Sequence, residues 1–187
     1  MFITDQQFLS IQVRDIEKAT YENCTFTNSV FADEFLSFVT FEECEFHDCD
    51  FSSVKFNDVS FKNVTFVGCK MIGVPFDALN DFLLEMRFEN CLLGFSNFYK
   101  LELKNTTFYN CQLNEVDFSE ANLSGSSFDE CNFVGAQFFK TNLMKCDLSM
   151  VQNLNLDPTV NNIVNAKFSL DGLPGLLGKY KLKIVWF

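Results

Sequence analysis

The chain has 187 residues, of which 25 are Phe, 8 are Cys and one is His, and its formal net charge is −11. With a single His and no Cys-x-x-Cys pair, the sequence lacks the ligand patterns of zinc and haem sites, so we expect no metal or cofactor. No apolar run is long enough to span a bilayer, and no basic stripe is present for direct binding of nucleic acid. The first residues lack the basic and apolar segments of a signal peptide, so we expect a cytoplasmic protein that does not enter a membrane.

A five-residue repeat runs through most of the chain. Every fifth residue is large and apolar, most often Phe or Leu, and we call this residue the centre of its repeat. Fourteen centres run from Ile11 to Phe76, and fourteen more run from Leu83 to Leu148. A period of five fits neither an α-helix nor a simply alternating strand, and internal repetition of this kind indicates a solenoid.

The residue two places before the centre is small or apolar in most repeats. All eight cysteines occupy this position, namely Cys24, Cys44, Cys49, Cys69, Cys91, Cys111, Cys131 and Cys146. The other three positions are mostly polar, so each repeat has two inward and three outward side chains. We therefore interpret the thiols as small hydrophobic core groups that are free and unreactive.

Several repeats are close to the motif A(D/N)LXX, including Ala121-Asn122-Leu123-Ser124-Gly125 and Cys146-Asp147-Leu148-Ser149-Met150. In this the chain resembles the pentapeptide-repeat family. The resemblance implies an all-β fold, a right-handed quadrilateral β-helix in which four repeats make one square coil of twenty residues. Twenty-eight repeats would then make about seven coils within residues 1–151, a rod roughly 34 Å long at the usual strand spacing.

Residues twenty apart should stack in columns if each coil has twenty residues. Phe26, Phe46 and Phe66 then form one column, and Phe88 continues it only if two residues are inserted between the halves. We place this insertion near residues 77–82, as a bulge made by Asp77, Ala78, Leu79, Asn80, Asp81 and Phe82. Asp81 would occupy an inward site, and Leu83 would be the next centre.

Residues 152–187 are predicted to form a C-terminal cap. The segment after Ser169 predicts a short helix, with Asp171 near its N-cap and Gly178 past its end, and residues 179–184 alternate like a half-buried strand. The cap resembles that of the Qnr/MfpA branch, which implies a two-fold homodimer joined end to end at the C-terminus; a monomeric end cap is the alternative. The expected interface residues are Leu173, Leu176, Leu177, Tyr180, Leu182 and Ile184.

Acidic residues are concentrated in two stretches that contain no Lys or Arg, from Ala19 to Val54 and from Asn105 to Phe139. They either form a solvated surface that keeps a Phe-rich rod soluble or bind a basic partner. The candidate partner-binding residues are Asp33, Glu34, Glu42, Glu43, Glu45, Asp48, Asp50, Glu115, Asp117, Glu120, Asp129 and Glu130.

The sequence contains no phosphate-binding glycine loop, nucleophile elbow or H-E-x-x-H motif, so we expect a protein that is not an enzyme. The Qnr/MfpA resemblance implies a rod that mimics DNA, binds DNA gyrase or topoisomerase IV, and protects that topoisomerase from quinolone-type poisons. Each candidate acid would stand in for a phosphate. The absence of long projecting loops leaves open whether such a rod protects gyrase or only inhibits it. The alternative is a scaffold or immunity factor with a different protein partner.

Overall fold

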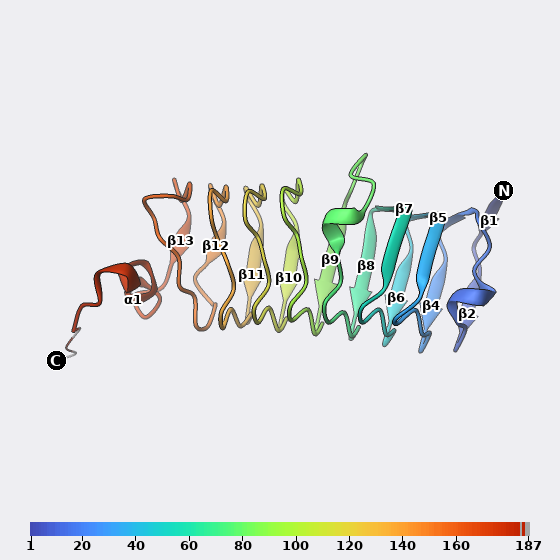
Figure 1. The fold of residues 1–187 in the computed structure, drawn as a ribbon, viewed down its shortest axis with the longest axis horizontal. Coiled ribbons are helices and arrows are strands. Elements are labelled where there is room, and N and C mark those ends of the chain that lie inside the picture. The colour runs from blue at the N-terminus through green and yellow to red at the C-terminus, as the bar shows by residue number, and fades with distance from the viewer. Residues whose placement is uncertain (184, 186–187) are drawn as a thin grey trace.

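The computed structural model describes residues 1–183 and 185. The chain winds into one rod with its two termini at opposite ends, and a short helix caps the C-terminal end (Figure 1). Ile184, which we expected at the dimer interface, lies outside the described residues.

Within the described residues, thirteen short strands and four short helical segments make up the coil and its cap. In the first half these are β1 (Phe2–Thr4), β2 (Gln7–Leu9), η1 (Val13–Asp15), β3 (Thr20–Glu22), β4 (Thr25–Thr27), β5 (Phe35–Glu42), β6 (Glu45–His47), β7 (Lys55–Lys62), β8 (Val64–Val67) and η2 (Phe76–Ala78). In the second half they are β9 (Met86–Glu89), β10 (Thr107–Tyr109), β11 (Ser127–Asp129), β12 (Asp147–Leu148), β13 (Lys167–Phe168), α1 (Leu173–Leu176) and η3 (Gly178–Tyr180).

The rod has four faces, which we number in chain order. Face 1 begins with the sheet β1-β3-β5-β7 and continues as a row of bridges from Glu102 to Asn162, and face 2 is the nine-stranded parallel sheet from β2 to β13. Face 3 is the row of bridges from Gln12 to Gln152. Face 4 joins Phe35–Ser37 of β5 to β7 and continues as bridges from Pro75 to Gln137. Because nine strands follow one another on face 2, the chain completes eight turns between the first and the last, one more than the repeats predicted.

The pairing register confirms a coil of twenty residues with two departures. Phe26 lies opposite Phe46, which is twenty residues on, but Phe66 lies opposite Phe88, which is twenty-two residues on. The predicted two-residue insertion is therefore correct. The first turn is two residues short, because Phe2 lies opposite Thr20. At the other end β13 still pairs with β12, so coil pairing continues beyond residue 151.

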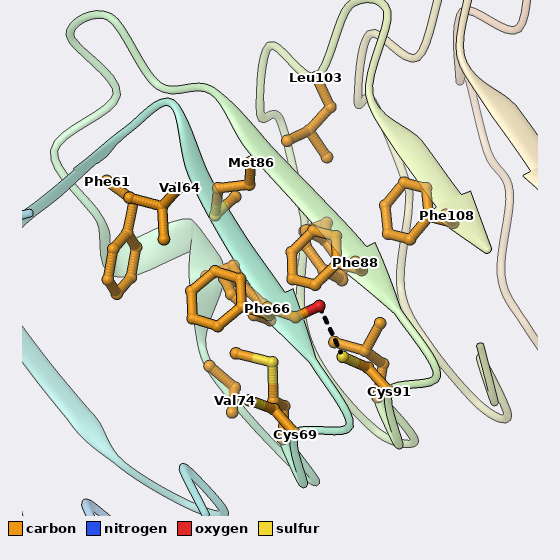
Figure 2. Packing of buried hydrophobic residues seen from close by; sticks show 14 of the residues in the cluster. Phe61, Val64, Phe66, Cys69, Val74, Met86, Phe88, Cys91, Leu103 and Phe108 are labelled. Atoms are coloured by element: carbon orange, nitrogen blue, oxygen red, sulfur yellow. Dashed lines mark hydrogen bonds between the residues drawn. The ribbon is translucent and has the colours of Figure 1, made fainter. Parts of the chain in front are cut away.

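Stacked aromatic rings fill the core along face 2 (Figure 2). The ring centroids of Phe46 and Phe66 are 5.2 Å apart, those of Phe66 and Phe88 5.3 Å, and those of Phe88 and Phe108 5.0 Å. All four rings are fully buried. Offset stacking of this kind adds about 0.5–1.5 kcal/mol per pair to the free energy gained by burying the rings. No single turn could bury such a layer alone, so each turn depends on its neighbours.

The second inward position satisfies backbone carbonyls inside the rod. The thiol of Cys91 donates to the carbonyl of Phe66 in the preceding turn at 3.4 Å (Figure 2). Ser96 and Thr141 occupy the same position in other repeats and donate to the equivalent carbonyls at 2.7 and 2.8 Å. All eight cysteines are buried and free, and burial raises the pKa of the Cys44 thiol to about 12. The thiols are thus core groups, and burial favours the protonated form of Cys44.

The predicted placement of the insertion is wrong in detail. Leu79 is buried at an inward site, and the backbone N–H of Asn80 still bonds to Val59 of the preceding turn, so the chain leaves the coil only after Asn80. Asp81 is exposed rather than inward, and Leu83 is not a centre, because its side chain is 65% exposed. Leu84 packs against the core instead. The result is a loop that projects from the rod between η2 and β9 (Figure 1).

The short C-terminal helix is confirmed, but the strand after it is not. The N-cap of α1 is Gly172, directly after Asp171, and Gly178 lies past the helix end, where it begins η3. Lys179 and Tyr180 belong to η3, and Lys181 forms a turn with a positive φ of 51°, so residues 179–183 are not a strand. Lys179 of this segment contacts the last coil, as described below.

Candidate partner-binding surface

The twelve candidate acids all point out of the coil, and none is buried. Nine are exposed, and the remaining three, Glu42, Asp50 and Asp117, are half-buried. They do not lie on one face. They follow the edges of the rod, where the chain turns from one face to the next.

Two edges carry acids in both halves of the rod. Asp48 lies at the edge between faces 2 and 3, beside Asp50 on face 3, and Asp129 and Glu130 lie at the same edge farther along. The edge between faces 3 and 4 carries Asp33, Glu34 and Glu115, with Asp117 beside it on face 4. Glu42, Glu43 and Glu45 are gathered at the edge between faces 1 and 2, whereas Glu120 stands apart at the edge between faces 4 and 1. These placements follow from the strand and bridge registers.

Left-handed backbone at the corners explains why many of these acids project outward. In most repeats the residue two places after the centre has a positive φ, which is 53° at Glu43, 52° at Asp48 and 58° at Glu130. Asn, Asp and Gly adopt this conformation most readily, and Asn or Gly fills the corner in many other repeats. Six candidate acids occupy such corners: Asp33, Glu43, Asp48, Glu115, Glu120 and Glu130.

Four of the candidate acids have a cationic or titratable partner. The ion pairs join Glu42 to Lys62 at 3.8 Å, Asp50 to Lys70 at 3.2 Å, Glu120 to Lys100 at 3.7 Å, and Glu45 to His47 at 2.9 Å. Burial alone would raise the pKa of Asp50, but hydrogen bonds from Ser52 and Lys70 outweigh it and lower that pKa. Within the described residues the other eight candidates form no ion pair, so their charge is available to a partner.

Sequence reasoning missed a contrasting feature on face 4. Exposed aromatic rings lie there beneath lysine ammonium groups, with Lys18 over Phe38 at 4.8 Å, Lys55 over Phe35 at 4.9 Å, and Lys140 over Phe139 at 5.3 Å. The signal was available in the sequence, because these three Phe residues do not occupy centre positions. The rod is thus acidic along its edges and partly cationic and aromatic on one face.

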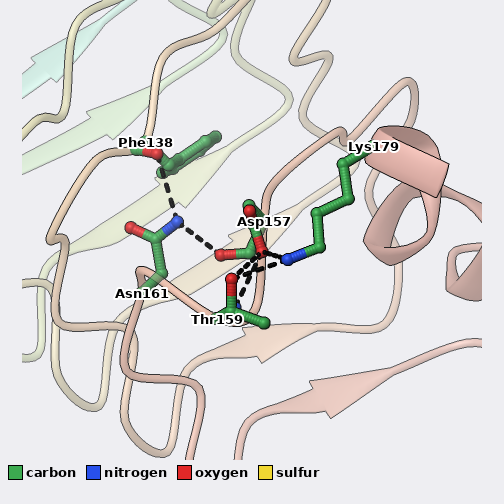
Figure 3. A network of polar contacts seen from close by, with 5 residues as sticks. All are labelled: Phe138, Asp157, Thr159, Asn161 and Lys179. Atoms are coloured by element: carbon green, nitrogen blue, oxygen red, sulfur yellow. Dashed lines mark hydrogen bonds and ion pairs between the residues drawn. The ribbon is translucent and has the colours of Figure 1, made fainter.

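The cap is tied to the last coil by a polar network (Figure 3). Lys179 donates to the Asp157 carboxylate at 2.7 Å and to the Thr159 hydroxyl at 2.6 Å. Asn161 donates to the carbonyls of Asp157 and Phe138. The hydrogen bond from Lys179 lowers the pKa of Asp157 to about 2. Lys179 therefore points back onto the coil, which leaves the leucines to form the end surface.

The expected dimer interface residues form only part of that end surface. Leu173, Tyr180 and Leu182 are 42%, 55% and 57% exposed, and Leu177 is 37% exposed. Leu176 instead packs against the core. An apolar surface is therefore present at the C-terminal end, and the dimer itself stays a prediction.

Within the described residues there is no group of His, Cys, Asp or Glu side chains that could hold a metal ion. A membrane-crossing helix is likewise not found in that part of the chain. The shallow grooves on the surface have volumes of about 280–430 Å³. The candidate surface is therefore an outer surface of the rod rather than a deep pocket.

Two protein-family models together match most of the repeat region. Residues 22–58 and 44–77 match the family model of pentapeptide repeats in eight copies, and residues 83–157 match the pentapeptide repeat region. The chain belongs to the pentapeptide-repeat family. No curated protein matches the sequence.

Solved structures share the fold at low sequence identity. A trypsin-treated variant of QnrB1, a plasmid-mediated fluoroquinolone resistance protein, matches with a TM-score of 0.75 at 18% identity, over 97% of this chain and 99% of QnrB1. Full-length QnrB1 matches with a TM-score of 0.57 at 19% identity, over 97% of this chain and 100% of its own. HetL from the cyanobacterium Nostoc sp. strain PCC 7120, involved in regulating heterocyst differentiation, matches with a TM-score of 0.58 at 14% identity, over 90% of this chain and 83% of HetL.

Proposed function

We propose that this protein mimics DNA, binds a type II topoisomerase, either DNA gyrase or topoisomerase IV, and protects that enzyme from quinolone-type poisons. The observation that carries the proposal is the set of unpaired carboxylates held outward along the edges of a rigid rod. A basic DNA-binding channel attracts an anionic rod in the way it attracts duplex DNA, with an affinity that falls as salt rises. The structural similarity to QnrB1 supports a topoisomerase, rather than another protein, as the partner of this rod.

The proposed contacts are the twelve candidate acids, and the corner acids Glu43 and Asp48 are the most informative among them. Each is exposed and free of ion pairs in the described part of the chain, and each is presented by left-handed backbone. Lys100 and Lys140 adopt the same backbone conformation at other corners. A lysine can therefore replace either acid without new backbone strain.

We further propose that the rod acts in the cytoplasm, where the topoisomerase works, as an end-to-end dimer through Leu173, Leu177, Tyr180 and Leu182. The dimer would double the length of the acidic rod. A self-complementary apolar end suits a two-fold contact, because the same patch meets itself across the axis.

The test is gyrase supercoiling of plasmid DNA in the presence of a fluoroquinolone, with this protein titrated at low salt. We expect supercoiling to recover at near-stoichiometric protein. Glu43→Lys and Asp48→Lys should each weaken the recovery about tenfold or more, which is the size expected for one lost charge contact at an interface.

Asp58→Lys is the matched control. Asp58 has the same corner backbone, with φ of 53°, and is not one of the twelve candidate contacts. It should leave protection within about threefold of the unchanged protein. If the protein neither restores supercoiling nor binds or inhibits gyrase, the proposal is wrong. A scaffold with another protein partner, as the likeness to HetL over 90% of this chain allows, then takes its place.

A further inference from the structure

The short first turn leaves an apolar groove on face 4 near the N-terminal end of the rod. β3 pairs only with Thr40–Glu42 of β5, and in the described part of the chain no bridge joins Phe35–Val39 to the first turn. The space beside this open stretch is a groove of about 280 Å³, lined by Val13, Ile16, Lys18, Phe35, Leu36, Ser37, Phe38 and Val39. Phe35 and Phe38 are 63% and 50% exposed. The groove can therefore receive an apolar side chain.

Two cations flank this groove without carboxylate partners. Lys18 and Lys55 rest over the rings of Phe38 and Phe35. Neither forms an ion pair within the described residues, although the protein has a formal net charge of −11. The nearby Asp15 carboxylate is engaged by the backbone N–H of Gln12 at 2.9 Å. The groove thus suits an apolar side chain that has a carboxylate next to it.

The projecting loop carries an exposed apolar side chain with a carboxylate next to it. Asp81 is exposed, and it is followed by Phe82 and Leu83, which are 68% and 65% exposed. Two hydrogen bonds shape the loop. The side-chain oxygen of Asn80 accepts the N–H of Phe82 at 3.1 Å, and the backbone carbonyl of Asp81 accepts the N–H of Leu84 at 3.2 Å. Leu83 has a φ of 59°, a left-handed conformation that is unfavourable for an aliphatic residue. Apolar side chains held outward in this way are typical of a contact site.

We propose that two copies of this protein associate side by side, with Phe82 of each copy inserted into the face 4 groove of the other. Asp81 would then meet Lys18 and Lys55 across the contact. The groove lies at the first two turns and the loop after the fourth, so the two sites are roughly 10–15 Å apart along the rod at the usual strand spacing. The loop leaves the coil after Asn80 on face 1, next to face 4, and we place a two-fold axis between antiparallel rods so that the loop of each copy reaches the groove of the other in an isologous, closed contact. This association uses neither the C-terminal end nor the topoisomerase.

A second copy fits the groove better than a nucleic acid strand does. Stacking on aromatic rings with lysines nearby would also suit single-stranded nucleic acid. However, a strand running along face 4 would bring its phosphates past Asp58, Asp117 and Glu120, which lie along that face and its edges. The loop of a second copy presents only the carboxylates next to its apolar tip, such as that of Asp81 next to Phe82.

The experiment is a charge swap between separate proteins, all carrying Leu173→Glu so that association through the C-terminal end cannot contribute. Lys18→Glu alone places a new carboxylate against Asp81 at both contacts, and Asp81→Lys alone places a new ammonium group against Lys18 at both contacts. Sedimentation equilibrium should show each variant associating at least about tenfold more weakly than the parent. In a mixture of the two variants, each groove can meet a loop of opposite charge. Mixing should therefore restore association to within about threefold of the parent.

Phe82→Ser is the second variant and should abolish association without changing the circular dichroism spectrum, because the side chain is exposed in the single rod. A parent that stays monomeric at the highest concentration measured overturns the proposal. So does a mixture that associates no more tightly than either variant alone, or an unchanged dissociation constant for Phe82→Ser. None of these results bears on gyrase protection, which is measured separately with the unchanged protein.

Discussion

The two halves of the rod share one backbone repeat but are held together differently. In the first half the residue before the centre is often Thr, as at Thr25, Thr40 and Thr65, and these residues lie in strands. In the second half it is often Asn, as at Asn122 and Asn142, and the backbone there forms isolated bridges followed by turns.

Side-chain chemistry explains the difference. Thr is β-branched and favours extended backbone. The side-chain oxygen Oδ1 of Asn142 instead accepts the backbone N–H of Met144 at 3.2 Å, which closes a local turn. Its amide donates to Asn122 in the turn before at 2.9 Å, and the Asn162 amide donates to Asn142 at 3.0 Å. Both halves therefore contain stacked aromatic rings, but the first half adds longer strand pairing and the second adds a ladder of side-chain amides.

The largest expected effect is on the aromatic core of the first half. Phe66→Ala should lower the free energy of unfolding by about 3–5 kcal/mol, because it removes a fully buried ring that stacks on Phe46 and Phe88 and leaves a cavity. Leu123→Ala in the second half should cost less, about 2–3 kcal/mol, since it removes fewer atoms and no ring stacking. Denaturant unfolding of both variants checks this. Equal losses would show that a stacked ring stabilises the core no more than a buried leucine does.

Much of this architecture follows from the sequence, because each inward position recurs every five residues. The columns of Phe26, Phe46 and Phe66, the buried thiols and the two-residue insertion are all confirmed. Counting repeats along the sequence could not identify which residues near the insertion leave the coil. Leu79, Leu83 and Leu84 are chemically alike, and packing alone decides that Leu79 and Leu84 face the core while Leu83 does not.

The tail and the candidate surface were predictable only in part. Alternating Lys and apolar residues from Lys179 onward fit a strand, but an ion pair to Asp157 and a hydrogen bond to Thr159 fold Lys179 back onto the coil. Contacts of this kind, about twenty residues apart in sequence, have no local signal. Outward placement of the acids followed from the repeat, whereas their distribution over the edges depends on which repeats carry them at left-handed corners.

A smaller effect is expected from breaking the amide ladder of the second half. Asn142→Asp keeps an oxygen for the N–H of Met144 but cannot donate to Asn122, so we expect a loss of about 1–2 kcal/mol in the free energy of unfolding. Asn97→Asp is the matched control. Asn97 accepts the N–H of Tyr99 at 2.9 Å, and in the described part of the chain its amide donates to no other side chain. The control should cost under about 0.5 kcal/mol; a similar loss in both variants would assign the effect to the turn rather than the ladder.

The smallest expected effect is a pH dependence at the C-terminal end of the second half. Asp147 of β12 accepts hydrogen bonds from Lys167 of β13 at 2.8 Å and from the Ser149 hydroxyl at 2.6 Å, and the bond from Lys167 is the main reason that its pKa is lowered from 3.8 to about 2. The folded state therefore favours the ionised carboxylate. Its contribution to stability is complete above about pH 4, where the unfolded chain is also ionised, and is lost as the pH falls toward about 2.

Because the Asp147 side chain remains partly exposed, we expect this contribution to stay below about 1 kcal/mol. Unfolding of the unchanged protein and of Asp147→Asn should differ at about pH 5 and converge near about pH 2. A difference that stays constant over this range would mean that Asp147 acts through its turn with Ser149 rather than through its charge.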